Sequence, residues 1–295
     1  MSDHRIDAIS RDPPIDRDYP AQTTAHAVPS GGLNLNALFY SAAGPGPHPT
    51  ILLLHGLPGN EQNIDLAQSV RRSGWNVLTI HYRGSWGGPG TFTFANCLED
   101  ADAAVQWLRR KASTNDLRID GKRIAIVGHS MGGFVALHTV VGASDLLGAA
   151  LISGVDLGMA FGKPTQGQTE VDENVGITAG LHILQGTSAQ TLADEAKANA
   201  EGWRLTNYAA RLATCPILLV TADDGFAEGS DALADAILAG GGQLVSRANF
   251  STDHSYSDHR IKLQMVMLDW LRDVDPNFKG ATDVAKLPSQ VLLSR

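Results

Sequence analysis

The sequence has little cysteine and no excess of positive charge. Cys97 and Cys215 are the two cysteines among 295 residues, too few for the disulfide framework of a small secreted domain. Lys and Arg total 23 against 31 Asp and Glu, a formal net charge of -8. This balance argues against nucleic acid or an anionic membrane surface as the main partner.

Long apolar runs are also missing. No stretch is long and apolar enough to span a bilayer, and the first thirty residues are polar and charged, without the apolar segment of a signal peptide. We therefore expect a cytoplasmic protein with no membrane span and no nucleic-acid partner. Hydrophobic residues make up 43% of the chain and charged residues 18%, as in an ordinary globular protein.

Short apolar stretches alternate with stretches of helical periodicity. The apolar runs lie at 50–54, 76–82, 123–127 and 216–221, and each predicts a strand covered on both faces. Helices are expected between and after them, the last over 256–271. This alternation predicts an α/β fold with a mostly parallel central sheet and helices on both faces. Ligands of such sheets bind outside the carboxyl ends of the strands.

One turn at such a strand end carries a nucleophile motif. The run Gly128-His129-Ser130-Met131-Gly132 follows the strand 123–127 and leads into a helical stretch, 134–140. Strand, G-x-S-x-G and helix in this order form a nucleophile elbow, which lifts the serine hydroxyl clear of the sheet on a strained turn. The alternative is a glycine-rich turn in which Ser130 only caps the helix.

Three further strand ends carry polar groups. His55-Gly56-Leu57-Pro58-Gly59 follows the strand 50–54, where the alternative is a plain turn into a helix. Asp223 and Asp224 follow the strand 216–221, and His254 and His259 follow a short strand at 243–247. A serine hydroxyl needs a base, histidine suits that task near neutral pH, and a carboxylate fixes the histidine tautomer.

This series of motifs resembles the α/β-hydrolase fold family over residues 23–273, in particular its serine esterases and lipases. It is also similar to the prolyl-peptidase and dienelactone-hydrolase branch. The family order is nucleophile, acid, histidine. The resemblance implies Ser130 as nucleophile, Asp224 rather than Asp223 as acid, and His254 rather than His259 as base, because His259 falls inside the expected last helix.

The oxyanion of the reaction needs two N–H donors. Met131, the residue after the nucleophile, supplies one, and the resemblance implies Leu57 as the other. The reaction needs no cofactor and no metal. Two Asp-His pairs stand at 253–254 and 258–259, but a separation of five residues suits one metal ion poorly.

The chain divides into a core and an insertion. We expect an N-terminal tail at 1–22, the core at 23–153 and 212–273, a helical cap at 154–211, and a C-terminal tail at 274–295. Four aromatic residues are candidates to bind substrate; the alternative is that they pack beneath the cap. They are Trp86, Phe92, Phe161 and Trp203.

The leading hypothesis is a carboxylesterase (EC 3.1.1.-) that cleaves a small-molecule ester through an acyl-enzyme. The same triad would also serve an amide or peptide hydrolase or a thioesterase. A non-catalytic binding protein with a hydrolase fold is the remaining class. Relatives that cleave haloalkanes or epoxides carry Asp where Ser130 stands, so the serine disfavours those reactions. The oligomeric state is not encoded in any of these motifs.

Overall fold

The computed structural model describes residues 4–162, 180–275 and 277. Residues 163–179 of the predicted cap and nearly all of the predicted C-terminal tail lie outside this range. Within it, eight strands form one sheet in the order β1-β2-β4-β3-β5-β6-β7-β8. Their bounds are β1 Gln22–Ser30, β2 Leu33–Ser41, β3 His48–Leu54, β4 Asn76–Ile80, β5 Ile119–His129, β6 Ala149–Ile152, β7 Ile217–Ala222 and β8 Val245–Phe250.

The sheet is mostly parallel. Strand β2 pairs antiparallel with β1 and with β4, and all other neighbouring strands run parallel. The helices are α1 His4–Ser10, α2 Ile64–Arg72, α3 Phe94–Thr114, α4 Met131–Gly142, α5 Leu157–Gly162, α7 Ala189–Asn199, α8 Ala227–Ala239 and α9 Arg260–Val274, with 3-10 turns η1 Leu181–Ile183 and η2 Leu205–Leu212. The predicted α/β fold class is confirmed.

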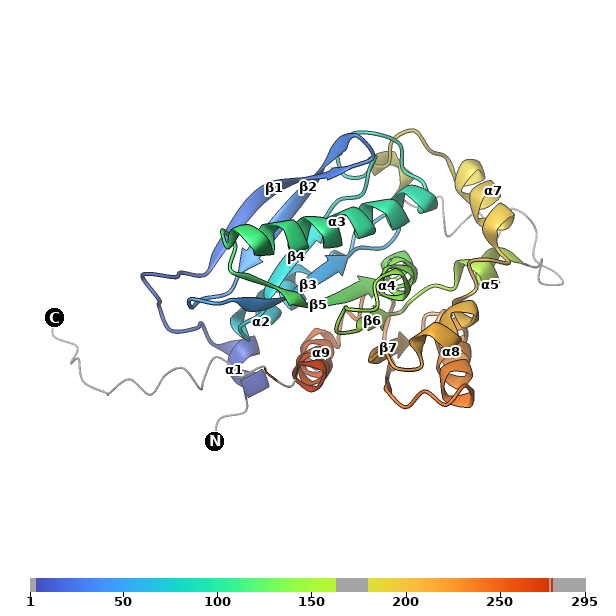
Figure 1. Ribbon diagram of the computed structural model, residues 1–295. Helices are drawn as coiled ribbons and strands as arrows, with labels where there is room; N and C mark the ends of the chain where they lie inside the picture. Colours follow the sequence, from blue (N-terminus) through green and yellow to red (C-terminus); the bar gives the residue numbers. More distant parts are fainter. Residues whose placement is uncertain (1–3, 163–179, 276, 278–295) are drawn as a thin grey trace.

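Helices cover both faces of the sheet (Figure 1). Because side chains alternate along a strand, the apolar run of β3 serves two cores. Ile51 and Leu53 pack in a core with residues of α2 and α9. Leu52 and Leu54 pack in the other, with residues of α3, α4 and α8. Burial on both faces explains why this strand reads as an unbroken apolar run.

The structure differs from the predicted elements at both ends of the chain. Helix α1 lies inside the segment predicted as a tail, and the guanidinium of Arg72 donates to the carbonyls of Ala8 and Ile9. Helix α9 begins at Arg260 rather than 256. Tyr256 has φ 57, and its buried hydroxyl donates to Val220 O at 3.1 Å, so the chain turns there before the helix starts.

The segment between β6 and β7 packs on the α3 and α4 side. In α7, the Glu195 carboxylate accepts the N–H groups of Phe94 and Ala95 at 2.9 and 2.8 Å. These N–H groups belong to the first turn of α3, where a helix offers free donors and a partial positive charge. Asp156 joins the two ends of the segment, because its carboxylate accepts Met159 N–H at 2.8 Å and Leu205 N–H at 3.0 Å.

No helix in the described part of the chain combines the length and the apolar character needed to cross a membrane.

The structure predicts that Asp156→Ala destabilises this segment. Asp156 is 6% exposed, so its removal leaves two amide donors without an acceptor, which costs about 1–3 kcal/mol. Urea denaturation measures the change in the free energy of unfolding. Asp145→Ala is the control: that carboxylate pairs with Arg109 and is 67% exposed, so we expect little change. Equal stabilities of the two variants would contradict the role given to Asp156.

Candidate active site

Ser130 occupies the sharp turn between β5 and α4. Its backbone angles are φ 57° and ψ -125°, a combination that residues other than glycine rarely adopt. The flanking glycines are required by space. A Cβ on Gly128 would lie 1.9 Å from Gly132 O, and one on Gly132 would lie 2.5 Å from Leu54 O. The strand and helix on either side thus hold Ser130 in the strained geometry of a nucleophile elbow.

The loop after β3 lies directly against Ser130. A Cβ on Gly56 would come 2.7 Å from Ser130 Cβ and 3.2 Å from its Oγ, so this residue must be glycine for the loop to approach. The backbone N–H groups of Leu57 and Met131 donate to no other residue within the described ranges. As far as the described residues go, two donors without an acceptor therefore stand on the two segments that meet at the serine.

His55 braces this loop from inside. Its Nδ1 lies 2.8 Å from the carbonyl oxygen of Gly56, and since a carbonyl only accepts, Nδ1 carries the proton. Burial lowers the pKa of His55 to about 4, so the ring is neutral at pH 7. A Cβ on Gly59 would lie 2.3 Å from His55 Nδ1. The ring and the loop backbone are thus packed with no room between them.

Asp224 and His254 form a hydrogen-bonded pair. His254 Nδ1 lies 2.8 Å from Asp224 Oδ2, and the Asp224 side chain is only 3% exposed. Burial by itself would raise the pKa of Asp224, but hydrogen bonds from His254, Ser153 and the Phe226 N–H outweigh it and lower that pKa. The carboxylate therefore stays ionised and directs the Nδ1 proton of His254 toward itself, which leaves Nε2 free to accept a proton.

The two alternative residues take other positions. Asp223 is exposed and accepts the hydroxyl of Ser251 at 2.6 Å. His259 stands at the N-terminus of α9, where its ring contacts Asp258 and Phe250. Neither contacts the Asp224–His254 pair through any hydrogen bond in the described part of the chain.

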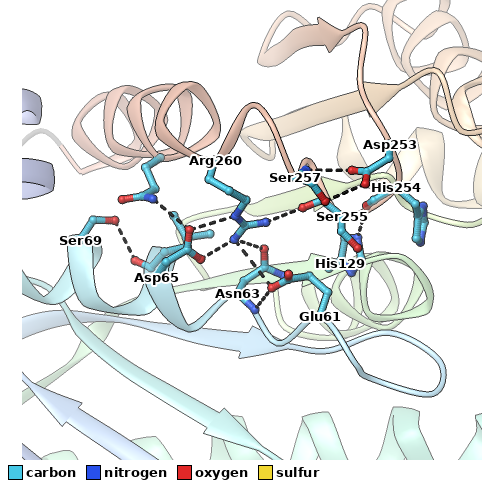
Figure 2. Close-up of polar contacts among 12 residues, drawn as sticks. Glu61, Asn63, Asp65, Ser69, His129, Asp253, His254, Ser255, Ser257 and Arg260 are labelled. Atoms are coloured by element: carbon cyan, nitrogen blue, oxygen red, sulfur yellow. Dashed lines mark hydrogen bonds and ion pairs between the residues drawn. The ribbon is translucent and has the colours of Figure 1, made fainter. Parts of the chain in front are cut away.

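His129 links the turn that carries Ser130 to the loop that carries His254, a contact that the sequence analysis missed. Its Nε2 donates to the backbone carbonyl of His254 at 2.8 Å, and the two ring centroids lie 4.7 Å apart. Figure 2 shows His129 beneath His254. Burial lowers the pKa of His129 to about 4, so it is a neutral donor. No local signal identifies this role, because the partner lies 125 residues away.

His129, the residue before Ser130, contacts both the backbone and the ring of His254. Among the described residues, Ser130 Oγ makes no hydrogen bond with His254. Catalytic hydrogen bonds are often long or open without substrate and tighten when it binds.

The four candidate pocket residues divide into two kinds. Trp86 is 37% exposed and its indole N–H donates to Pro58 O at 3.1 Å, while Phe161 is partly buried at the end of α5. Phe92 has no exposed surface and Trp203 is 8% exposed. The Trp203 ring packs against Phe94 and Phe134. Phe92 and Trp203 are therefore packed in the interior, which agrees with the alternative to substrate binding for these two residues.

The described residues contain no cluster of three or more His, Cys, Asp and Glu side chains placed to hold a metal ion. The candidate groups are a serine, an imidazole bonded to a carboxylate, and two backbone N–H groups that have no acceptor within the described ranges. Such a set can attack and stabilise a carbonyl group.

Comparison with known proteins identifies the family of the chain. A family model described as "Alpha/beta hydrolase family" matches residues 51–288. An uncharacterized protein of Mycobacterium tuberculosis is 28% identical over 132 residues, which are 41% of this chain and 45% of that protein. Lysophosphatidylserine lipase ABHD12 of Danio rerio is 30% identical over 122 residues, 39% of this chain and 30% of the lipase. The chain thus spans less than half the length of these relatives.

The structural match covers more of the chain. The thermostable carboxylesterase EstE1, cloned from a metagenomic library, has a TM-score of 0.63 and 21% sequence identity, covering 92% of this chain and 94% of that one. At this identity the match shows the fold alone, and peptidases are also among the similar structures. The family match, which covers most of the chain, and the shared fold lead to one conclusion: the chain belongs to the alpha/beta hydrolase family.

Proposed function

We propose that the protein is a serine hydrolase that cleaves carboxylic esters of small molecules, a carboxylesterase. The observation that carries the proposal is the 2.8 Å hydrogen bond between His254 Nδ1 and Asp224 Oδ2, formed beside a strained Ser130 turn. The ester preference is supported by two similar proteins, the lipase ABHD12 and the carboxylesterase EstE1.

The first half of the proposed reaction forms an acyl-enzyme. Substrate binding brings His254 Nε2 within reach of Ser130 Oγ, and the imidazole takes the hydroxyl proton as the oxygen attacks the ester carbonyl. The N–H groups of Leu57 and Met131 stabilise the negative charge on the carbonyl oxygen. When the tetrahedral intermediate collapses, His254 returns the proton to the leaving alcohol.

The second half repeats these steps with water. His254 removes a proton from a water molecule, which attacks the acyl group on Ser130, and the acid leaves as the serine recovers its proton. Asp224 keeps the imidazole in one tautomer and stabilises its charged form in both halves. Every proton transfer in this scheme passes through side chains of the chain itself.

Trp86 and Phe161, the two candidate aromatics that are not fully packed, are the proposed contacts for the substrate. Trp86 bonds to the loop that carries Leu57, so it lies at the rim of the proposed oxyanion site. Phe92 and Trp203 both pack against Phe94 in the interior, so they are left out of the proposed substrate contacts.

Replacing the nucleophile tests the proposal. Ser130→Ala removes the attacking oxygen, so kcat/KM for p-nitrophenyl butyrate should fall by about 10⁴-fold or more, as in other triads. Circular dichroism checks that the variant remains folded. Ser113→Ala, a hydroxyl on the exposed side of α3, is the matched control and should retain full activity. A Ser130→Ala enzyme that hydrolyses esters at the wild-type rate would overturn the proposed function.

The acid is tested by comparing two neighbouring aspartates. Asp224→Asn should lower kcat by about 10⁴-fold, because an amide donor favours the wrong tautomer of His254. Asp223→Asn changes the same charge in an exposed position, and its kcat should stay close to that of the wild type. Steady-state kinetics on the same ester measures both. The reverse result, with Asp223→Asn the inactive variant, would show that the acid is misassigned.

A further inference from the structure

Arg260 lies between the histidine loop and the segment that follows the oxyanion loop (Figure 2). We call residues 253–257 the histidine loop and residues 55–60 the oxyanion loop. The Arg260 guanidinium donates to the backbone carbonyl of Ser255 at 2.8 Å. Ser255 directly follows His254, so this bond acts on the backbone that carries the proposed base.

The other side of the guanidinium holds the start of α2. Arg260 Nε donates to Asp65 Oδ2 at 2.9 Å, and a second nitrogen donates to Asp65 Oδ1 and to Asn63 Oδ1. Glu61 accepts the Asn63 N–H at 2.5 Å and lies 3.8 Å from Arg260. Glu61, Asn63 and Asp65 come directly after the oxyanion loop in the sequence.

This arrangement is better suited to setting a geometry than to adding stability. The side chain of Arg260 is 19% exposed and that of Asp65 is 41% exposed, and both line an open groove with Ser257 and Asn60. Ion pairs with this much access to water contribute little to stability. The planar guanidinium, however, fixes the direction of several acceptors at once, which a lysine ammonium does not.

We propose that Arg260 is a positioning residue that holds the histidine loop at a fixed distance from the oxyanion loop. The inference rests on the proposed function, in which His254 and Leu57 act on the same substrate group at the same moment. Misplacement of one such group by about 1 Å can cost about 100-fold in rate. Loss of Arg260 would leave both groups present but not held in one geometry.

The test compares Arg260→Gln with Arg123→Gln. Arg123 is 20% exposed, much like Arg260, and Arg123→Gln also removes an ion pair, although its partner Asp275 is more deeply buried than Asp65. Arg123 lies six residues before His129, the last residue of β5, which is about 20 Å at about 3.3 Å per residue. At a temperature well below both Tm values, Arg260→Gln should lower kcat for p-nitrophenyl butyrate by about 10- to 100-fold with a nearly unchanged KM. Arg123→Gln should leave both constants unchanged.

A second readout does not depend on activity. Hydrogen exchange followed by mass spectrometry should show faster exchange in both the histidine loop and the oxyanion loop of Arg260→Gln, and in neither loop of Arg123→Gln. Unchanged exchange in both loops, or an unchanged kcat in a folded Arg260→Gln enzyme, would overturn the inference. A wild-type protein that neither hydrolyses esters nor reacts with a fluorophosphonate would instead overturn the proposed function, while the exchange comparison would still decide whether Arg260 couples the loops.

Asp65→Asn tests the same link from the α2 side, and its kcat alone decides the inference if Arg260→Gln does not fold. It removes the ion pair from the α2 side and leaves the bond from Arg260 to Ser255 O in place. The kcat of Asp65→Asn should also fall. The kcat of the double variant should be no lower than that of Arg260→Gln alone, because both substitutions break the same link. Additive losses in the double variant would contradict a shared role.

Discussion

The close approach of two loop backbones is the constraint on which the rest of the structure depends. Gly132 lies so near the end of β3 that no side chain fits between them, and Gly56 lies equally near Ser130. These contacts join the carboxyl ends of β3 and β5, which are paired neighbours in the sheet. The strained Ser130 conformation and the N–H groups of Leu57 and Met131 therefore belong to a single packed unit.

The Asp224–His254 pair reaches this unit from the other half of the sheet. Asp224 follows β7 and His254 follows β8. His129 joins the turn that carries Ser130 to the loop that carries His254, and Asp224 bonds to His254 and to Ser153, which follows β6. Two neutral, buried histidines, His55 and His129, support backbone carbonyls on either side of the serine. They are structural groups, whereas the side chain proposed to transfer protons in the reaction is His254.

Much of this could be predicted from the sequence because its signals are local. Apolar runs and a strand–turn–helix pattern fix β3, β5 and the Ser130 turn. Asp223 and Asp224 are adjacent and chemically identical, so the sequence offers only a weak preference, and their different surroundings arise from the fold. The contact of His129 with His254 and the ion pair of Arg260 with Asp65 were missed because the partners lie 125 and 195 residues apart in the chain. Helix α1 and the late start of α9 also depend on tertiary contacts.

The central claim is that one serine does the chemistry. It is tested most directly by treating the wild-type protein with a fluorophosphonate until ester hydrolysis stops and locating the adduct by tandem mass spectrometry. The account predicts one phosphonyl group per chain, on Ser130, and a loss of activity in proportion to its occupancy. An adduct on a different residue, or full hydrolysis by a chain whose Ser130 is completely modified, would contradict it.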